Sequence, residues 1–133
     1  MNKKKIISLI VVLLAIILIL LAVCTLSSPH EGGINLLPLN SPPGENTVIV
    51  PVTEEDLDRH PALRIALETS EPIIISKNPI HILQFGERCI TIAEAREIEN
   101  KFSFMYMDND TSSLKYRYIL WNNTYYQVQS YRV

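Results

Sequence analysis

The chain has 133 residues, with 12 Lys and Arg against 14 Asp and Glu, which gives a formal net charge of −2. This length allows one ordinary domain plus an appendage and excludes two full domains. Residues 27–133 keep 9 basic side chains (12 minus Lys3, Lys4 and Lys5) and all 14 acidic ones, a net charge of −5. Binding to phosphate groups needs a basic surface, so this composition argues against nucleic acid as a partner.

The first part of the chain predicts a membrane anchor. Residues 6–26 carry no charged side chain and are rich in Ile, Leu and Val. A helix of this length spans roughly 30 Å, the thickness of the hydrocarbon core of a bilayer. Three lysines precede it, and the next Lys or Arg is Arg59. This asymmetry predicts a single-pass protein of the cell membrane, with a cytoplasmic N-terminus and residues 27–133 outside.

Two other interpretations of this segment stay open. A cleaved signal peptide has an apolar core of about 7–15 residues and a site with small residues. The present run is longer, and Leu21-Ala22-Val23 fits such a site poorly. A lipoprotein signal ends in a lipidated cysteine, and Leu21-Ala22-Val23-Cys24 resembles that motif except at Val23, where a small residue is expected. We prefer an uncleaved helix in which Cys24 is an ordinary apolar residue.

Outside this helix Cys89 is the only cysteine, so an internal disulfide is excluded from the predicted outer part. Its apolar neighbours predict a buried structural thiol, with an intermolecular disulfide as the alternative.

Proline and glycine content divides the rest of the chain. Residues 27–46 hold four of the eight prolines and three of the four glycines and show little periodicity, which predicts an extended tether. Its patch Leu36-Leu37-Pro38-Leu39 is more apolar than a plain spacer and could dock on the domain or lie at the lipid interface. The folded domain is expected over residues 47–133, and 48–52 predicts a short edge strand that contains Pro51.

Local signals predict two helices in succession. Thr53 precedes three acidic residues, which is typical of a helix start, so we expect a helix near 54–59. Pro61 suits the first turn of a second helix near 61–69.

The middle of the chain predicts strands at 73–75 and 80–85, because prolines and Gly86 bound two short apolar runs. Thr91 with Glu94 three residues later resembles a capping box and predicts a helix near 92–102. Ile92, Ala95, Ile98 and Phe102 recur at the spacing of one helical face, which we expect to be buried.

The last third predicts a β-hairpin. Residues 108–113 are rich in turn formers, and strands are expected at 114–121 and 124–133, joined at Asn122-Asn123. The predicted fold class is therefore α+β: an N-terminal transmembrane helix, then a small domain with an antiparallel sheet and two to three helices.

Two segments carry a resemblance to a known group of proteins. The pattern Thr53–Leu57 followed by His60–Leu63 and a helix, and the closing segment Tyr118–Val128, resemble small single-pass membrane proteins of methanogenic archaea. The resemblance covers residues 47–133. It implies a location and a fold, and it implies no activity and no functional residue.

Nothing in the sequence points to a particular reaction. No Gly-x-Ser-x-Gly elbow is present, and the glycines form no phosphate loop. Metal ligands would have to come from His30, His60, His81, Glu87 and Cys89, which lack the spacing of metal-binding motifs. We therefore predict no catalytic, cofactor-binding or metal-binding residue, no cofactor and no enzyme.

Two surface features remain as candidates for binding. The acidic run Glu54-Glu55-Asp56 with Asp58 could hold a divalent cation, although a solvated helix start is the interpretation we prefer. Aromatic residues of the hairpin, of which we single out Trp121, Tyr125 and Tyr131, could form a contact surface for a carbohydrate or a protein, although a sheet packed on its helices is the interpretation we prefer.

Two Asn-x-Ser/Thr sequons begin at Asn109 and Asn122, both in predicted turns and both predicted to lie outside the membrane. Both asparagines are therefore candidate glycosylation sites, and Asn109 is the better acceptor because its turn is longer.

Together these observations predict a membrane-anchored protein that displays a small non-catalytic domain for binding or assembly with an envelope protein or glycan. An accessory subunit of a membrane complex is the alternative, and a lipoprotein anchored at Cys24 is a further one. An apolar patch on the domain would favour the first hypothesis, and co-purification with other membrane subunits would favour the second.

Overall fold

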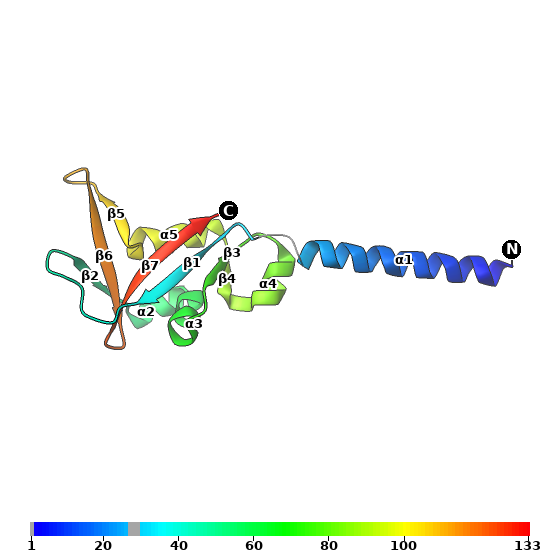
Figure 1. Ribbon diagram of the computed structural model, residues 1–133, viewed down its shortest axis with the longest axis horizontal. Helices are drawn as coiled ribbons and strands as arrows, with labels where there is room; N and C mark the ends of the chain where they lie inside the picture. The colour runs from blue at the N-terminus through cyan, green and yellow to red at the C-terminus, as the bar shows by residue number, and fades with distance from the viewer. Residues whose placement is uncertain (1, 27–29) are drawn as a thin grey trace.

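A computed structural model describes residues 2–26 and 30–133 and shows one long helix followed by a separate folded domain (Figure 1). Helix α1 (Lys3–Leu26) runs without interruption. Over Lys3–Cys24 it is long and apolar enough to cross a membrane, as a signal sequence at this position would also be.

The domain is built on one mixed sheet, which the described residues form from seven strands in the order β2-β6-β7-β1-β3-β4, with β5 paired to β6. The strands are β1 (Gly32–Pro38), β2 (Val48–Pro51), β3 (Ile73–Ile75), β4 (Cys89–Ile90), β5 (Met105–Asp108), β6 (Ser113–Trp121) and β7 (Thr124–Arg132). The helices are α2 (Glu54–Arg59), α3 (Pro61–Thr69), α4 (Pro79–Phe85) and α5 (Ile92–Phe102). The α+β class is confirmed, but the sheet is not purely antiparallel, because β2 pairs with β6 and β3 with β4 in parallel.

Strand β1 corrects the predicted tether. Residues 32–38 pair with β7 along the whole strand and with β3 at one end, so β1 lies inside the sheet. Ile34 and Leu36 are buried in the core. The prediction of a tether over 27–46 is wrong for this part, and the domain begins well before residue 47. Residues 27–29 lie outside the described residues.

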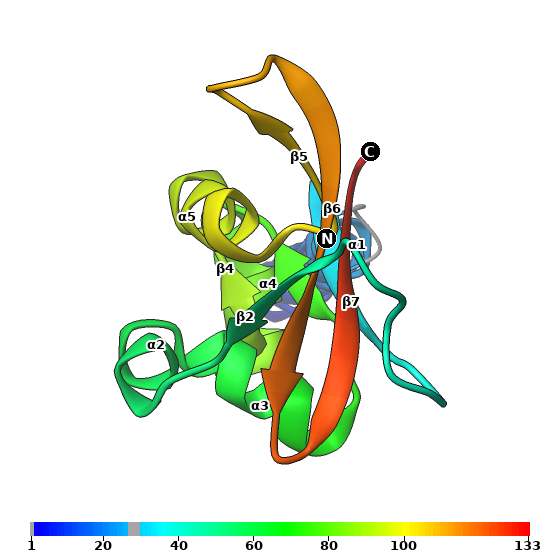
Figure 2. The ribbon, with the colours of Figure 1, turned by 90° about the vertical axis from the view of Figure 1, so that its left-hand side faces the viewer.

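Helices α2, α3 and α5 confirm the local signals. The Thr53 hydroxyl accepts from the Asp56 N–H and the Asp56 carboxylate accepts from the Thr53 N–H, which closes a capping box at α2. Thr91 caps α5 by accepting from the Glu94 N–H. The buried face of α5 is as predicted except at Ile92, which is exposed. Figure 2 shows α2 and α5 on the same side of β6 and β7.

Segment 80–85 is helix α4 and not the predicted strand. The Asn78 side chain accepts from the Ile80 N–H and Pro79 occupies the first turn, a combination that starts a helix. Gly86, at φ 60°, ends it. His81 points inward and shares a 2.6 Å hydrogen bond between its Nδ1 and the Ser76 Oγ.

The β6–β7 hairpin turns at Asn122 and Asn123, whose φ angles of 49° and 61° match the left-handed turn expected. Beyond the first three paired residues the two strands separate around Phe104. The Phe104 N–H donates to the Val128 carbonyl, and the Phe104 carbonyl accepts from the Arg117 N–H. The first half of β6 therefore leaves the sheet and pairs with β5 as a projecting arm.

The core lies between the sheet and the helices. Its largest fully buried side chains are Phe102, Ile34, Leu57, Leu63, Ile73, Ile75, Ile98, Ile119 and Val128.

Candidate functional site

The projecting arm, residues 105–116, carries an exposed apolar face. Met105 lies opposite Tyr116, and Met107 lies opposite Leu114. Cross-strand partners lie on one face of a β-ribbon, so these four side chains form one surface, which we call the apolar arm face. Their exposed fractions are 45–59%. Clusters of exposed apolar side chains mark interaction sites more often than scattered single ones do.

The other face of the arm is polar and holds the arm to the domain. The guanidinium of Arg117 lies over the Tyr106 ring at 4.5 Å from its centroid. Lys115 pairs with Asp108, and this hydrogen bond lowers the pKa of the Asp108 carboxyl. One face of the arm is therefore occupied by polar contacts. Among the described residues, no such contact covers the apolar arm face.

Arg117 fixes the base of the arm. It is buried and donates to three backbone carbonyls at the end of α5: Ser103 at 2.8 Å, Glu99 at 2.9 Å and Asn100 at 2.8 Å. The Glu99 carbonyl also accepts from the Ser103 N–H at 2.9 Å, the bond that ends α5. A cation at this end of the helix adds a donor to its last carbonyls and opposes the helix dipole. Burial lowers the pKa of the Arg117 guanidinium, and the nearby Tyr106 opposes that shift.

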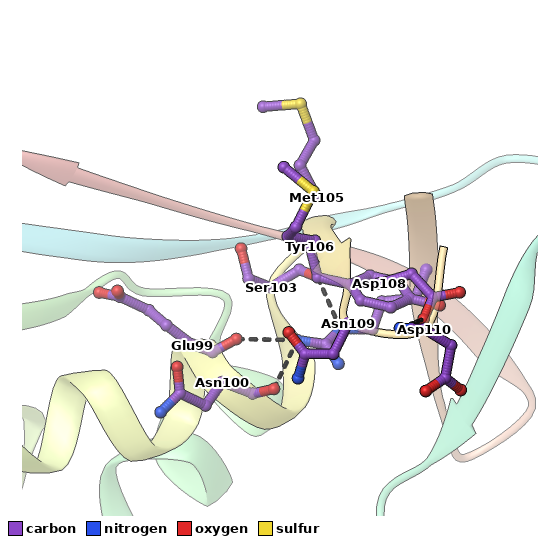
Figure 3. Close-up of a pocket in the computed structure, with 10 residues that line it drawn as sticks. Glu99, Asn100, Ser103, Met105, Tyr106, Asp108, Asn109 and Asp110 are labelled. Atoms are coloured by element: carbon purple, nitrogen blue, oxygen red, sulfur yellow. Dashed lines mark hydrogen bonds between the residues drawn. The ribbon is translucent and has the colours of Figure 1, made fainter. Parts of the chain in front are cut away.

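A polar cleft of about 760 Å³ lies between the end of α5 and the arm. Figure 3 shows Glu99, Asn100 and Ser103 along it, with Met105 directed away. Its charged groups are mostly paired: Glu99 with Arg132, Asp108 with Lys115, and Arg117 with the carbonyls above. This arrangement stabilises the base of the arm and leaves few groups for chemistry.

Two of the candidate metal ligands from the sequence, His30 and His81, lie beside each other, with their ring centroids 6.4 Å apart. His60 is buried at the junction of α2 and α3, with its Nδ1 3.2 Å from the Glu94 Oε1. His30 contacts the Tyr131 hydroxyl at 3.0 Å, and His81 bonds to Ser76. Among residues 2–26 and 30–133, no group of three or more His, Cys, Asp and Glu side chains is placed to hold a metal ion.

Cys89 is half-buried on β4, and its Sγ donates to the Ser76 carbonyl at 3.8 Å. Burial raises the pKa of this thiol, and the bond to Ser76 opposes that shift. A thiol with a raised pKa is a poor nucleophile, which agrees with a structural role.

The acidic run at α2 has two parts. Asp56 is buried, closes the capping box and pairs with Lys101 from α5. Glu54 and Asp58 are exposed and both contact Arg64, at 3.0 and 3.2 Å. The run is thus a helix start with its own cationic partners.

The structure does not bring the three predicted contact residues together. Trp121 is partly buried and packs against the core, and Tyr125 follows it across the hairpin turn. Tyr131 lies at the other end of β7, where its ring covers Gly33. Their contact with a partner stays a prediction.

The candidate modification sites are all exposed. Asn109 lies in the turn at the tip of the arm, and Asn122 lies in the hairpin turn. Cys24 is exposed near the end of α1.

Comparison with known proteins adds no relative, because no family model, no curated protein and no solved structure matches the chain. The functional inference therefore depends on geometry, and the resemblance to archaeal membrane proteins stays a prediction.

The apolar arm face is the feature that the sequence did not single out. Its signal is present, since Met105, Met107, Leu114 and Tyr116 alternate with polar or aromatic neighbours. Placing them on one exposed surface also requires the register of β5 on β6, which only the structure supplies.

Proposed function

We propose that this chain is a single-pass protein of the cell membrane, with its N-terminus in the cytoplasm and its domain outside. The domain acts without catalysis and assembles with an envelope protein through the apolar arm face. The length and composition of α1 support the anchor, and the three lysines before it support the orientation.

One observation carries the binding role, namely the exposure of Met105, Met107, Leu114 and Tyr116 on a single projecting face. Methionine and tyrosine are enriched at protein–protein contacts, because they adapt in shape and bury much area. A protein partner therefore fits this face better than a glycan. The arm lies at the end of the domain far from α1, where a partner in the envelope can reach it (Figure 1).

The test is a pair of matched variants of the full-length protein in native membranes. Met107→Gln combined with Leu114→Gln keeps side-chain size but makes the arm face polar. Lys115→Gln changes the neighbouring residue on the opposite face. We expect the double variant to lose the higher-mass complex seen on native gel electrophoresis, and Lys115→Gln to keep it.

Thermal unfolding of both variants in detergent controls for the fold, because surface substitutions usually change the free energy of unfolding by about 0.5 kcal/mol or less.

A complex that survives the double variant but is lost when α1 is replaced by an unrelated apolar helix would favour the accessory-subunit hypothesis. An intact mass that begins at Cys24 with a lipid adduct would favour the lipoprotein hypothesis.

A further inference from the structure

The end of the domain that faces α1 is covalently held close to it. Leu26 ends α1, and four peptide units later His30 is already fixed to the domain. An extended chain covers about 3.5 Å per residue, so this link spans at most about 14 Å.

Three contacts fix the chain at residues 30 and 31. The His30 Nε2 lies 3.0 Å from the Tyr131 hydroxyl. The Glu31 N–H donates to the Ile75 carbonyl at 2.8 Å, and the Glu31 carbonyl accepts from the Val133 N–H at 2.8 Å. These bonds continue the sheet, so the domain has no long linker on which to move away from α1.

Helix α4 lies beside the end of α1 (Figure 1), and residues of the two helices lie close together. Within α4, His81 is buried, whereas the next two residues, Ile82 and Leu83, are exposed. The exposed fraction of Leu83 is 82%, the highest of any large apolar side chain described in the domain. Lys77, just before α4, is also largely exposed, and its Nζ lies 3.8 Å from the Glu31 Oε1. A long exposed lysine side chain of this kind can extend toward lipid phosphates.

We infer that Ile82 and Leu83 insert into the interfacial layer of the bilayer that α1 spans, so that α4 seats the domain on the membrane in one orientation. This inference rests on the proposed anchoring by α1. Three observations converge on a lipid surface as the occupant: the short link, the place of α4 beside α1, and the exposure of adjacent apolar residues with a lysine nearby. In this orientation the arm lies at the end of the domain away from the membrane (Figure 1).

The experiment measures the depth of tryptophan in vesicles. Full-length protein is reconstituted in dioleoylphosphatidylcholine and in the same lipid with dibrominated acyl chains, which quench nearby tryptophan. Trp121, the single tryptophan of the chain, is the last residue of β6, before the β6–β7 turn, which lies at the end of the domain away from α1 (Figure 1). It serves as an internal reference. Leu83→Trp probes α4, and Met107→Trp, also at an exposed apolar position, is the matched control on the arm.

We expect the brominated lipid to lower the fluorescence of L83W by about a third or more, because interfacial side chains lie roughly 5–10 Å into the boundary with the acyl chains. The wild type and M107W should change little. Equal quenching in all three proteins, or stronger quenching of M107W, would overturn the seating by α4.

A second measurement separates this inference from the proposed anchor. Vesicles are washed at alkaline pH, which removes peripheral proteins and keeps spanning helices. Retained protein with unquenched L83W contradicts only the seating of the domain. Loss of the protein from the vesicles contradicts the anchor itself.

Discussion

At the scale of single residues, Gly32 and Gly33 decide how closely β1 approaches β7. A Cβ at Gly32 would lie 2.2 Å from the Tyr131 carbonyl oxygen, and one at Gly33 would lie 2.7 Å from the Tyr131 hydroxyl. Glycine inside a strand often marks such a close approach of another backbone. Gly44, by contrast, lies in a loop with no atom near the place of a Cβ.

Gly32→Ala should therefore destabilise the domain, whereas Gly44→Ala should not. The new methyl group at residue 32 meets backbone, so the pairing with β7 must shift, at a cost of about 1–3 kcal/mol. Gly33→Ala should cost less, because it meets the Tyr131 ring, which can move. Thermal unfolding of the full-length variants in detergent measures the order, and equal stability of the residue 32 and residue 44 variants would contradict it.

At the scale of elements, α2 is held by a polar contact with α5. Asp56 is buried, accepts bonds from Thr53 and pairs with Lys101. Burial alone would raise the pKa of the Asp56 carboxyl, but the bonds from Lys101 and Thr53 together lower it below its usual 3.8. This carboxylate therefore joins two helices as well as capping one.

Because the folded pKa of Asp56 lies below the unfolded one, the bonds stabilise the domain fully above about pH 4 and are lost as the pH falls through the lowered pKa. Asp56→Asn should lower the melting temperature clearly at pH 7 and by a smaller amount near pH 2. Asp58→Asn, at an exposed position on the same helix, is the matched control. A difference between D56N and wild type that stays constant over this pH range would contradict the assignment.

The elements also show which features a sequence can predict. Caps are local, so Thr53, Pro61 and Thr91 predicted three helices correctly. The prediction of a strand at 80–85 was wrong because a short apolar run between Pro79 and Gly86 suits a strand or a helix equally. The cap formed by the Asn78 side chain decides for the helix. The prediction of a tether over the residues of β1 was wrong because its glycines indicated a flexible segment. Their actual role is to allow the close approach of Tyr131, which lies near the other end of the chain. The apolar arm face was not predicted either, because it depends on the register of β5 on β6.

At the scale of the whole molecule, the two ends of the domain differ. One end carries α4 and the chain link to α1, and the other carries the arm (Figure 1). The proposed orientation sets both sequons on the outer side of the membrane. Asn109 lies at the exposed tip of the arm, whereas Asn122 adopts a left-handed backbone inside a two-residue turn.

In a host that glycosylates surface proteins, we expect Asn109 to be occupied more often than Asn122, because the looser turn can adapt to the transferring enzyme. Peptide mass spectrometry of native material measures both sites, with Asn109→Gln as the control for assignment. A glycan on Asn122 beside an unmodified Asn109 would contradict the ranking.

The pairing of β1 with β7 also sets the order in which this protein can be completed. Gly32 pairs with Arg132, so β1, the first strand to be synthesised, cannot complete its pairing until β7, the last strand, is available 100 residues later (132 minus 32). Such long-range pairing delays folding until its most distant partner is available. A chain threaded through a membrane from its N-terminal end would therefore stay without its central strand pair until nearly all of it had crossed. During that interval β1 can pair with β3, but its other edge, which later receives β7, stays open. If residues 27–133 cross the membrane as proposed, this open edge exposes the chain to wrong pairing while it crosses.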